Sequence, residues 1–113
     1  MSRTSRRRNA APSVVTILWR DIPAQVVANG VTTEKAMLPN RFQIAIDRAA
    51  KIADKTDLQA YVAEWRRVEQ PLGHERPGEA VASLIEELDR TYTRDRLAAL
   101  VRQGGLETSG DPA

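Results

Sequence analysis

The chain has 113 residues, of which 42% are hydrophobic, and this length and composition predict a single globular domain with its own core. It contains no cysteine, which excludes disulfides, thiolate metal sites and cysteine nucleophiles and is typical of a reducing cytoplasm. No apolar run reaches the roughly 20 residues needed to span a bilayer, so we expect a cytoplasmic protein that does not enter the membrane.

The formal charge of +2 is distributed unevenly along the chain. Residues 1–12 contain four arginines and no acidic residue, so the remainder has 13 of the 17 basic residues against all 15 acidic ones, a net charge of −2. We predict that residues 1–12 form a disordered Arg-rich tail that favours solubility, with contact to nucleic acid, another polyanion or a protein partner as the alternatives. A nucleic-acid-binding domain usually carries its positive charge on the folded surface, so the acidic body makes nucleic acid the less favoured partner.

The first predicted strand covers residues 13–19, which are rich in β-branched side chains. Pro23 lacks a backbone N–H, so we expect the strand ladder to break there and extended structure to resume over residues 24–28. Asn29-Gly30 then predicts a turn into another strand over residues 31–37.

The first predicted helix begins near Asn40, and its apolar residues recur at a spacing of 3.6 from Phe42 onward. Asp57 is expected to cap a short helical turn that runs into a strand near Glu64.

The second long helix is predicted to begin after Pro77-Gly78 and to end at Gly104-Gly105. Its apolar stripe slips near Thr93, which predicts a bend with Thr93 as a new cap. The order β-β-α-(α)-β-α indicates an α+β domain over residues 13–104, a small antiparallel sheet of about three strands with two main helices packed on one face. We expect residues 105–113 to be a disordered polar tail.

Both tryptophans of the chain are followed directly by arginine, as Trp19-Arg20 and Trp65-Arg66. Adjacent side chains of a strand point to opposite faces, so we expect each indole to be a buried anchor and each guanidinium to project from the other face. The predicted binding surface consists of Arg20, Asp21, Gln25, Glu64, Arg66 and Arg67. Three interpretations of this surface remain open: an internal lattice of salt bridges, a protein interface, or a site for a small anion.

No residues of the sequence form a complete catalytic or metal-binding constellation. His74 is the only histidine and lies in a predicted loop, so we expect it to be solvated. Glu86 and Asp89 share a helix face, which is more typical of a solvated surface than of a cation site. We therefore expect no metal, no cofactor and no catalytic residue, with a small enzyme or ligand-binding domain as the second alternative to an interaction protein.

Several segments resemble the small bacterial "virulence factor" domain family. They are the stretch 15–27, which contains Trp-Arg-Asp-Ile-Pro, the residues Arg41-Phe42 and 45–50, and Glu-Trp-Arg-Arg at 64–67. The resemblance spans roughly residues 14–88 and supplies no established catalytic residue. It implies similarity to small products encoded near folate- and corrinoid-dependent one-carbon enzymes, and hence an accessory subunit that docks to a protein partner.

Overall fold

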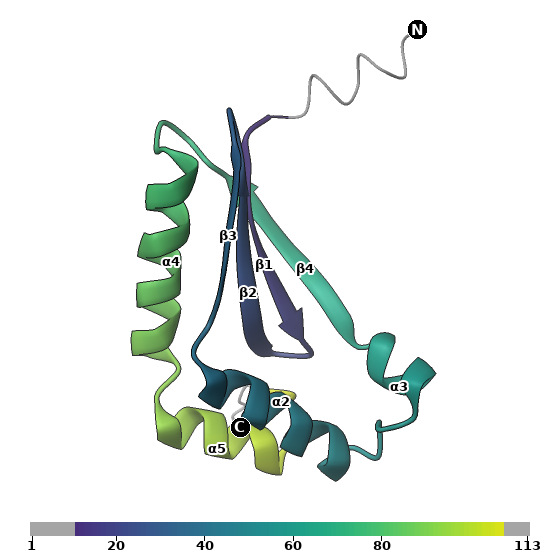
Figure 1. Ribbon diagram of the computed structural model, residues 1–113. Helices are drawn as coiled ribbons and strands as arrows, with labels where there is room; N and C mark the ends of the chain where they lie inside the picture. The colour runs from purple at the N-terminus through teal and green to yellow at the C-terminus, as the bar shows by residue number, and fades with distance from the viewer. Residues whose placement is uncertain (1–10, 108–113) are drawn as a thin grey trace, which may run out of the picture.

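The computed structural model describes residues 11–107 and shows an antiparallel sheet with helices on one face and across one end (Figure 1). The strands are β1 (Ser13–Trp19), β2 (Ile22–Asn29), β3 (Thr33–Met37) and β4 (Trp65–Pro71), in the spatial order β3-β2-β1-β4. The helices are α2 (Asn40–Ile52), α3 (Leu58–Val62), α4 (Pro77–Thr91) and α5 (Arg94–Arg102). The α+β class is confirmed, although the sheet has four strands rather than about three. Within residues 11–107, no helix has the length and apolar character needed to cross a membrane.

The additional strand arises where the sequence predicts a break. Arg20 and Asp21 form a tight turn, with Arg20 at φ 53°, and the chain returns directly along β1. The pairing register shifts between Ile17 and Leu18, opposite Pro23, so β2 contains an irregularity at the residue that lacks a donor. A bulge of this kind lets proline enter a strand. The predicted break at Pro23 is therefore wrong.

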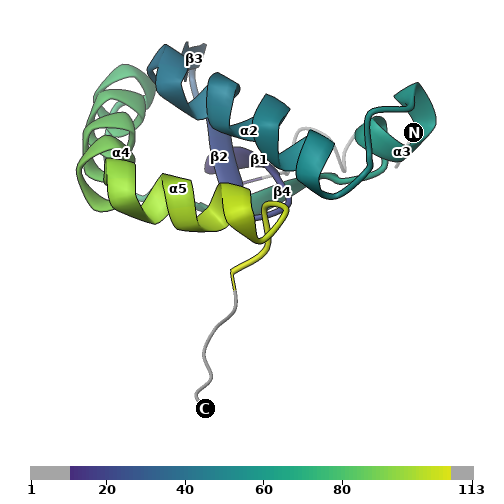
Figure 2. The same cartoon turned by 90° about the horizontal axis from the view of Figure 1, so that it is seen from below.

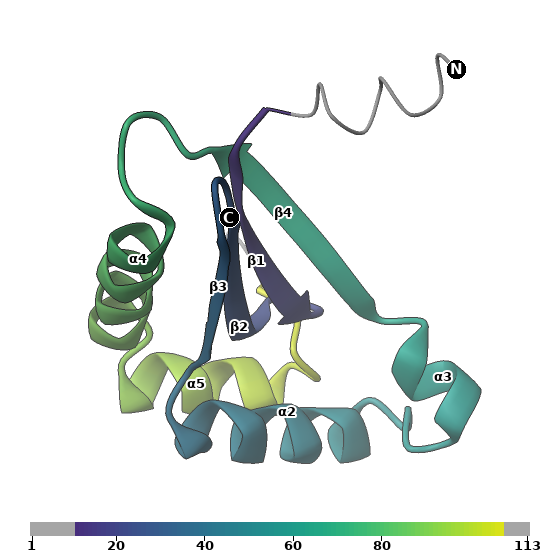
Figure 3. The ribbon, with the colours of Figure 1, turned by 45° about the horizontal axis from the view of Figure 1, so that its top comes forward.

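One face of the sheet is covered by α4, which packs along β2 and β3 (Figure 3). Val14, Val26 and Ala28 from the strands form a buried cluster with Ala80 and Val81 from the helix. These strand residues share one face because side chains alternate along a strand. Of the two main helices, α4 covers this face along its length, whereas α2 contacts β2 near one end of the sheet.

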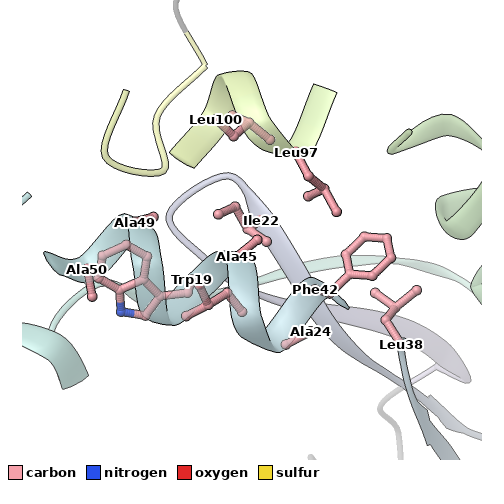
Figure 4. Packing of buried hydrophobic residues seen from close by; sticks show 11 residues of the cluster. Trp19, Ile22, Ala24, Leu38, Phe42, Ala45, Ala49, Ala50, Leu97 and Leu100 are labelled. Atoms are coloured by element: carbon pink, nitrogen blue, oxygen red, sulfur yellow. The ribbon is translucent and has the colours of Figure 1, made fainter. Parts of the chain in front are cut away.

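A second and larger core lies at the end of the sheet where β1 finishes. α2 and α5 lie side by side across this end (Figure 2). Figure 4 shows the side chains that fill the space between these helices and the strands, among them the fully buried Trp19, Phe42 and Ile22. The indole N–H of Trp19 donates to the Tyr61 carbonyl at 2.8 Å, and the two rings stack with centroids 5.7 Å apart. Trp19 is therefore fully buried in this core.

The starts of α3 and α5 have the predicted caps, whereas α2 begins after Pro39 without a side-chain cap. The Asp57 carboxylate accepts a hydrogen bond from the Ala60 amide at the start of α3, and the Thr93 hydroxyl accepts one from the Arg96 amide at the start of α5. The slip near Thr93 is a complete break between α4 and α5. Arg41 of α2 stabilises this break by donating to the Tyr92 and Asp89 carbonyls at 3.2 and 2.8 Å.

The chain beyond α5 folds back onto the domain. Gly104 and Gly105 have φ of 69° and 93°, a region that favours glycine, and both residues are buried. A Cβ on Gly105 would lie 3.0 Å from the Trp19 ring. Residues 105–107 thus contact the domain, although the sequence assigns them to the tail. Residues 1–10 and 108–113, on which most of the two tail predictions fall, lie outside the described residues.

Candidate functional site

The six residues of the predicted binding surface fall into two groups. Arg20, Asp21, Glu64 and Arg66 meet at the β1–β2 turn and are called the turn network here. Gln25 and Arg67 lie on a sheet face, each opposite Ile17 of β1 in the cross-strand register. The two groups have different surroundings and therefore different uses.

Arg20 is the most enclosed member of the turn network, with a side chain only 13% exposed. Its Nε donates to Oε1 of Glu64 at 3.1 Å, and its Nη1 donates to the Gly104 carbonyl at 3.1 Å. Its backbone N–H also donates to the Glu64 carbonyl at 3.0 Å. Arg20 thereby joins the β1–β2 turn to the start of β4 and to the end of α5.

Asp21 and Arg66 complete the network. Arg66 donates from Nη2 to Oδ1 of Asp21 at 2.8 Å and from Nε to the Arg20 carbonyl at 2.8 Å. The other carboxylate oxygen of Asp21 accepts from the Glu107 amide at 2.6 Å, while the Asp21 amide donates to the Gly105 carbonyl at 2.8 Å. Asp21 therefore holds the segment after α5 in place.

This geometry fits the interpretation of the turn network as an internal lattice of salt bridges. Arg20 lies in a turn with positive φ, so it does not project from a strand face as the Trp-Arg pattern predicts. Two guanidinium nitrogens of Arg20 and two of Arg66 already donate to groups of this chain. Four of the six guanidinium nitrogens of Arg20 and Arg66 are thus engaged within the chain, which leaves fewer donors for a small anion.

The two tryptophans lie directly opposite each other in neighbouring strands. Trp65 is only partly buried, because it lies on the outer strand β4, where its ring meets the edge of Tyr61 at a centroid distance of 6.0 Å. Trp65 is thus a weaker anchor than Trp19.

The second group lies on the sheet face opposite α4. The register places two rows of side chains across all four strands on this face, and we call these eight residues the open face: Met37, Gln25, Ile17 and Arg67 in one row, and Lys35, Val27, Val15 and Glu69 in the next. None of the eight belongs to either hydrophobic cluster that the helices form with the sheet.

The open face has an apolar centre and a charged rim. Val15, Ile17 and Val27 occupy the two central strands, and Val15 is buried although no helical cluster includes it. On the outer strands, Met37 is 60% exposed, and Lys35, Arg67 and Glu69 are also exposed. Arg67 forms no ion pair within residues 11–107. An apolar centre with a polar rim is the common anatomy of a protein interface.

The binding surface predicted from the sequence contains only two of the eight open-face residues, Gln25 and Arg67. The alternation in residues 13–19 shows that Val15 and Ile17 share a face, but both faces of that strand are partly apolar. Only the register with β2, β3 and β4 tells which face a helix covers. No sequence pattern predicts the contacts of Gly104 with Arg20 and of Glu107 with Asp21, because these residues lie more than 80 positions apart.

Tyr92 lies near the turn network, between α4 and α5. Burial raises the pKa of the Tyr92 phenol above its ordinary value of 10.0, and the nearby Arg96 opposes this shift. The Arg96 guanidinium lies 3.9 Å from the centroid of the Tyr92 ring and also pairs with Glu107 at 3.2 Å. These contacts give the segment after α5 a second attachment.

The remaining described residues show few features that indicate catalysis or metal binding. His74 is exposed in the loop before α4. Within residues 11–107, no three His, Cys, Asp or Glu side chains are grouped so that they could hold a metal ion. A cleft of about 280 Å³ lies between β4 and α4, with Gln70, Ser83 and Glu87 among its lining residues.

Comparison with known proteins gives one match. The sequence model of a family described as "Virulence factor" matches residues 17–101, from β1 to α5. No curated protein and no solved structure matches the chain. The matched region contains both Trp-Arg pairs and all four members of the row Met37, Gln25, Ile17 and Arg67.

Proposed function

The chain belongs to the virulence factor family, and we propose that it is a non-catalytic interaction protein that docks to a protein partner through the open face. The observation that carries the proposal is the contrast between the two faces of one sheet. α4 covers one face, whereas the rows centred on Val15 and Ile17 lie outside both hydrophobic clusters.

The chemistry of the open face suits a protein better than a small ligand. Its apolar residues lie along the central strands, where a flat partner surface can remove Ile17 and Val27 from water. The rim carries charges of both signs, with Lys35 at one edge and Arg67 and Glu69 at the other. Arginine near an apolar centre is a frequent contributor to binding energy in protein interfaces.

The turn network has a supporting role in this proposal. It fixes the β1–β2 turn and the start of β4, which are the segments that lead into Ile17, Gln25 and Arg67. A face whose strands are already held in position loses less conformational entropy when a partner binds. Arg20 and Arg66 are therefore positioning residues, and Gln25 and Arg67 are the members of the predicted surface that contact the partner.

The partner that we propose is a folate- or corrinoid-dependent one-carbon enzyme, which the protein would bind in the cytoplasm. This choice rests on the family resemblance and on the absence of cysteine, and it is independent of the open face. Nucleic-acid or polyanion binding through the Arg-rich tail is the alternative, and the arginines that would carry it lie within residues 1–10. A small-anion site at the turn network is less favoured, because four of the six guanidinium nitrogens of Arg20 and Arg66 already donate within the chain.

Two other exposed apolar residues, on α2 and α3, provide both a rival surface and a matched control. Ile52 at the end of α2 and Val62 in α3 are 61% and 54% exposed. The double variant Ile52→Ser/Val62→Ser removes apolar surface there, just as Ile17→Ser/Met37→Ser does on the open face.

The test is capture of partners by the tagged full chain in its native cell, with each captured protein quantified by mass spectrometry. We expect the wild type and Ile52→Ser/Val62→Ser to capture the same one-carbon enzyme, and Ile17→Ser/Met37→Ser to lose it. Met37→Ser alone should weaken capture, and thermal melts check that each variant is folded. Capture by the open-face variant at the wild-type level would contradict the proposal, and loss in the control alone would place the interface beside α3.

A further inference from the structure

β4 is an outer strand of the sheet, and its second edge is unpaired within residues 11–107. It pairs with β1 along its whole length, and Figure 1 shows it as the outermost strand, on the side of the sheet away from α4. An unpaired edge presents a row of backbone donors and acceptors to any strand that can align with them. The chemistry of this edge therefore decides which strand it accepts.

The hydrogen bonds at the two ends of the β1–β4 pair fix which backbone groups of β4 point outward. Leu72 donates to the Pro12 carbonyl at 3.0 Å, and Arg20 donates to the Glu64 carbonyl at 3.0 Å. In an antiparallel pair the residues bonded to the partner strand alternate with residues whose groups point away. The even-numbered residues of β4 therefore bond to β1, and the N–H and C=O groups of Arg67 and Glu69 point outward.

We propose that two copies of this chain pair through their β4 edges, antiparallel, about a twofold axis at Val68. In this register Arg67 of each copy lies opposite Glu69 of the other. Each such pair exchanges two backbone hydrogen bonds, so all the outward groups of Arg67 and Glu69 are satisfied. The side chains of the same residues bring opposite charges together twice, which stabilises cross-strand neighbours.

The neighbouring registers are less favourable. An axis at Arg67, Arg66 or Glu69 sets that residue against its own copy and so brings like charges together. An axis at Gln70 sets Glu69 against Pro71, which has no N–H to donate, and so leaves no complete hydrogen-bonded pair within β4. An axis at Val68 sets Pro71 against Trp65 instead and keeps both Arg67–Glu69 pairs complete. An axis that passes between two residues would set outward N–H and C=O groups of one copy against residues of the other copy whose groups point toward β1. The register centred on Val68 is the one that matches both charge and hydrogen bonding.

The other edge of the sheet lacks this complementarity. Leu38 donates to the Ala24 carbonyl at 2.9 Å, so the same alternation turns the backbone groups of Thr33, Lys35 and Met37 outward on β3. Lys35 is the only charged residue among these three, so no self-pairing of β3 sets opposite charges against each other at outward positions. β3 therefore offers a control for β4 within the same chain.

Pairing through β4 would join the two sheets into one sheet of eight strands. The open faces of the two copies would then be continuous across the twofold axis, with the Arg67 and Glu69 pairs at their junction. This inference shares Arg67 with the proposed function but does not depend on it, because the two copies pair through the backbone edge of β4, whereas the proposed docking uses the apolar centre of the open face.

The test is the mass of the full-length protein measured by sedimentation over a wide concentration range. We expect the wild type to double in mass as its concentration rises. Arg67→Glu and Glu69→Arg should each raise the dissociation constant about tenfold, because each replaces two attractive contacts by two repulsive ones. The double variant Arg67→Glu/Glu69→Arg restores complementarity and should return to the wild-type constant, and Lys35→Glu on β3 should leave it unchanged.

Three results would overturn the inference: a wild type that remains monomeric at every concentration, a charge-swapped double variant as weak as the single ones, or an equal loss in Lys35→Glu. Hydrogen exchange gives an independent check. The amides of Arg67 and Glu69 should become protected as concentration rises, while those of Thr33 and Lys35 exchange at a constant rate. Protection confined to β3 would also contradict the inference.

Discussion

Arg66 and Arg67 are neighbours in the sequence but belong to different parts of the molecule. Arg66 reaches into the turn network, where it bonds to Asp21 and to the Arg20 carbonyl. Arg67 lies on the open face and has no ion pair within residues 11–107. The alternation of a strand separates the two side chains, and the packing around each face then decides how each charge is used.

The same contrast applies to the regions around them. At the β1–β2 turn, charged groups are held by partners from β4 and from the segment after α5, so they serve the architecture. On the open face, the charges surround an apolar centre and form no ion pair within residues 11–107. The predictions below test this division, beginning with the largest expected effect.

Replacement of Trp19 should destabilise the protein most. Its indole is fully buried and packs against Tyr61 and Gly105, so Trp19→Ala should lower the free energy of unfolding by about 3–5 kcal/mol. Trp65→Ala should cost clearly less, because Trp65 is only partly buried. Urea denaturation of both variants measures the difference. Equal losses would show that the two rings are equivalent anchors.

Gly105→Ala tests the packing of the segment after α5. The new Cβ would meet the Trp19 ring at 3.0 Å, and the residue would have to keep φ 93°, so we expect a loss of about 1–3 kcal/mol or more. Gly73→Ala is the matched control, since Gly73 has φ 73° but no atom within 4 Å of the added Cβ. A similar loss in both variants would mean that backbone strain alone, and not the contact with Trp19, sets the cost.

Arg20→Ala should lower the free energy of unfolding by about 1–3 kcal/mol, because it leaves Glu64 and the Gly104 carbonyl without their donor. Arg67→Ala should change it by less than about 0.5 kcal/mol, as is usual for an exposed residue. The sequence pattern predicts that Arg20 projects from a sheet face, whereas its side chain is largely enclosed in the structure, and this enclosure is why we expect a loss of stability. Chemical denaturation that ranks Arg67→Ala as the more harmful change would reverse the proposed division.

The smallest effect concerns pH. Burial raises the pKa of Tyr92 above 10.0, so above that pH the unfolded chain releases this proton before the folded chain does. The contribution of Tyr92 to stability is therefore complete below its unfolded pKa and is lost as pH rises through its folded pKa. The difference in unfolding free energy between wild type and Tyr92→Phe, measured by urea denaturation, should fall over this range. A difference independent of pH would mean that the phenol is not buried in the fold.

The local parts of the fold could be predicted from the sequence. The β-branched run before Trp19, the 3.6-residue spacing after Phe42 and the caps at Asp57 and Thr93 depend on neighbouring residues, and the structure has all of them. The turn at Arg20 could not be predicted, because it depends on an irregularity that admits Pro23 into β2. A strand with a proline normally reads as a break.

The candidate site was predictable only in part, for a related reason. The sequence identifies arginines beside buried indoles, but the partners of Arg20 come from residues 44 and 84 positions away. Strand alternation separates Arg66 from Arg67, yet it does not tell which face α4 covers. The register that aligns Met37, Gln25 and Ile17 supplied this information.

Site-specific photo-cross-linking in the native cell tests the central claim most directly. A photoreactive residue placed at position 37 on the open face should form a cross-link to a partner protein, and the same residue at position 67 should cross-link to the same protein. At position 86 on α4, the cross-linker is a control on the other side of the molecule and should not capture that protein. Cross-links from position 86 with none from positions 37 and 67 would contradict the account.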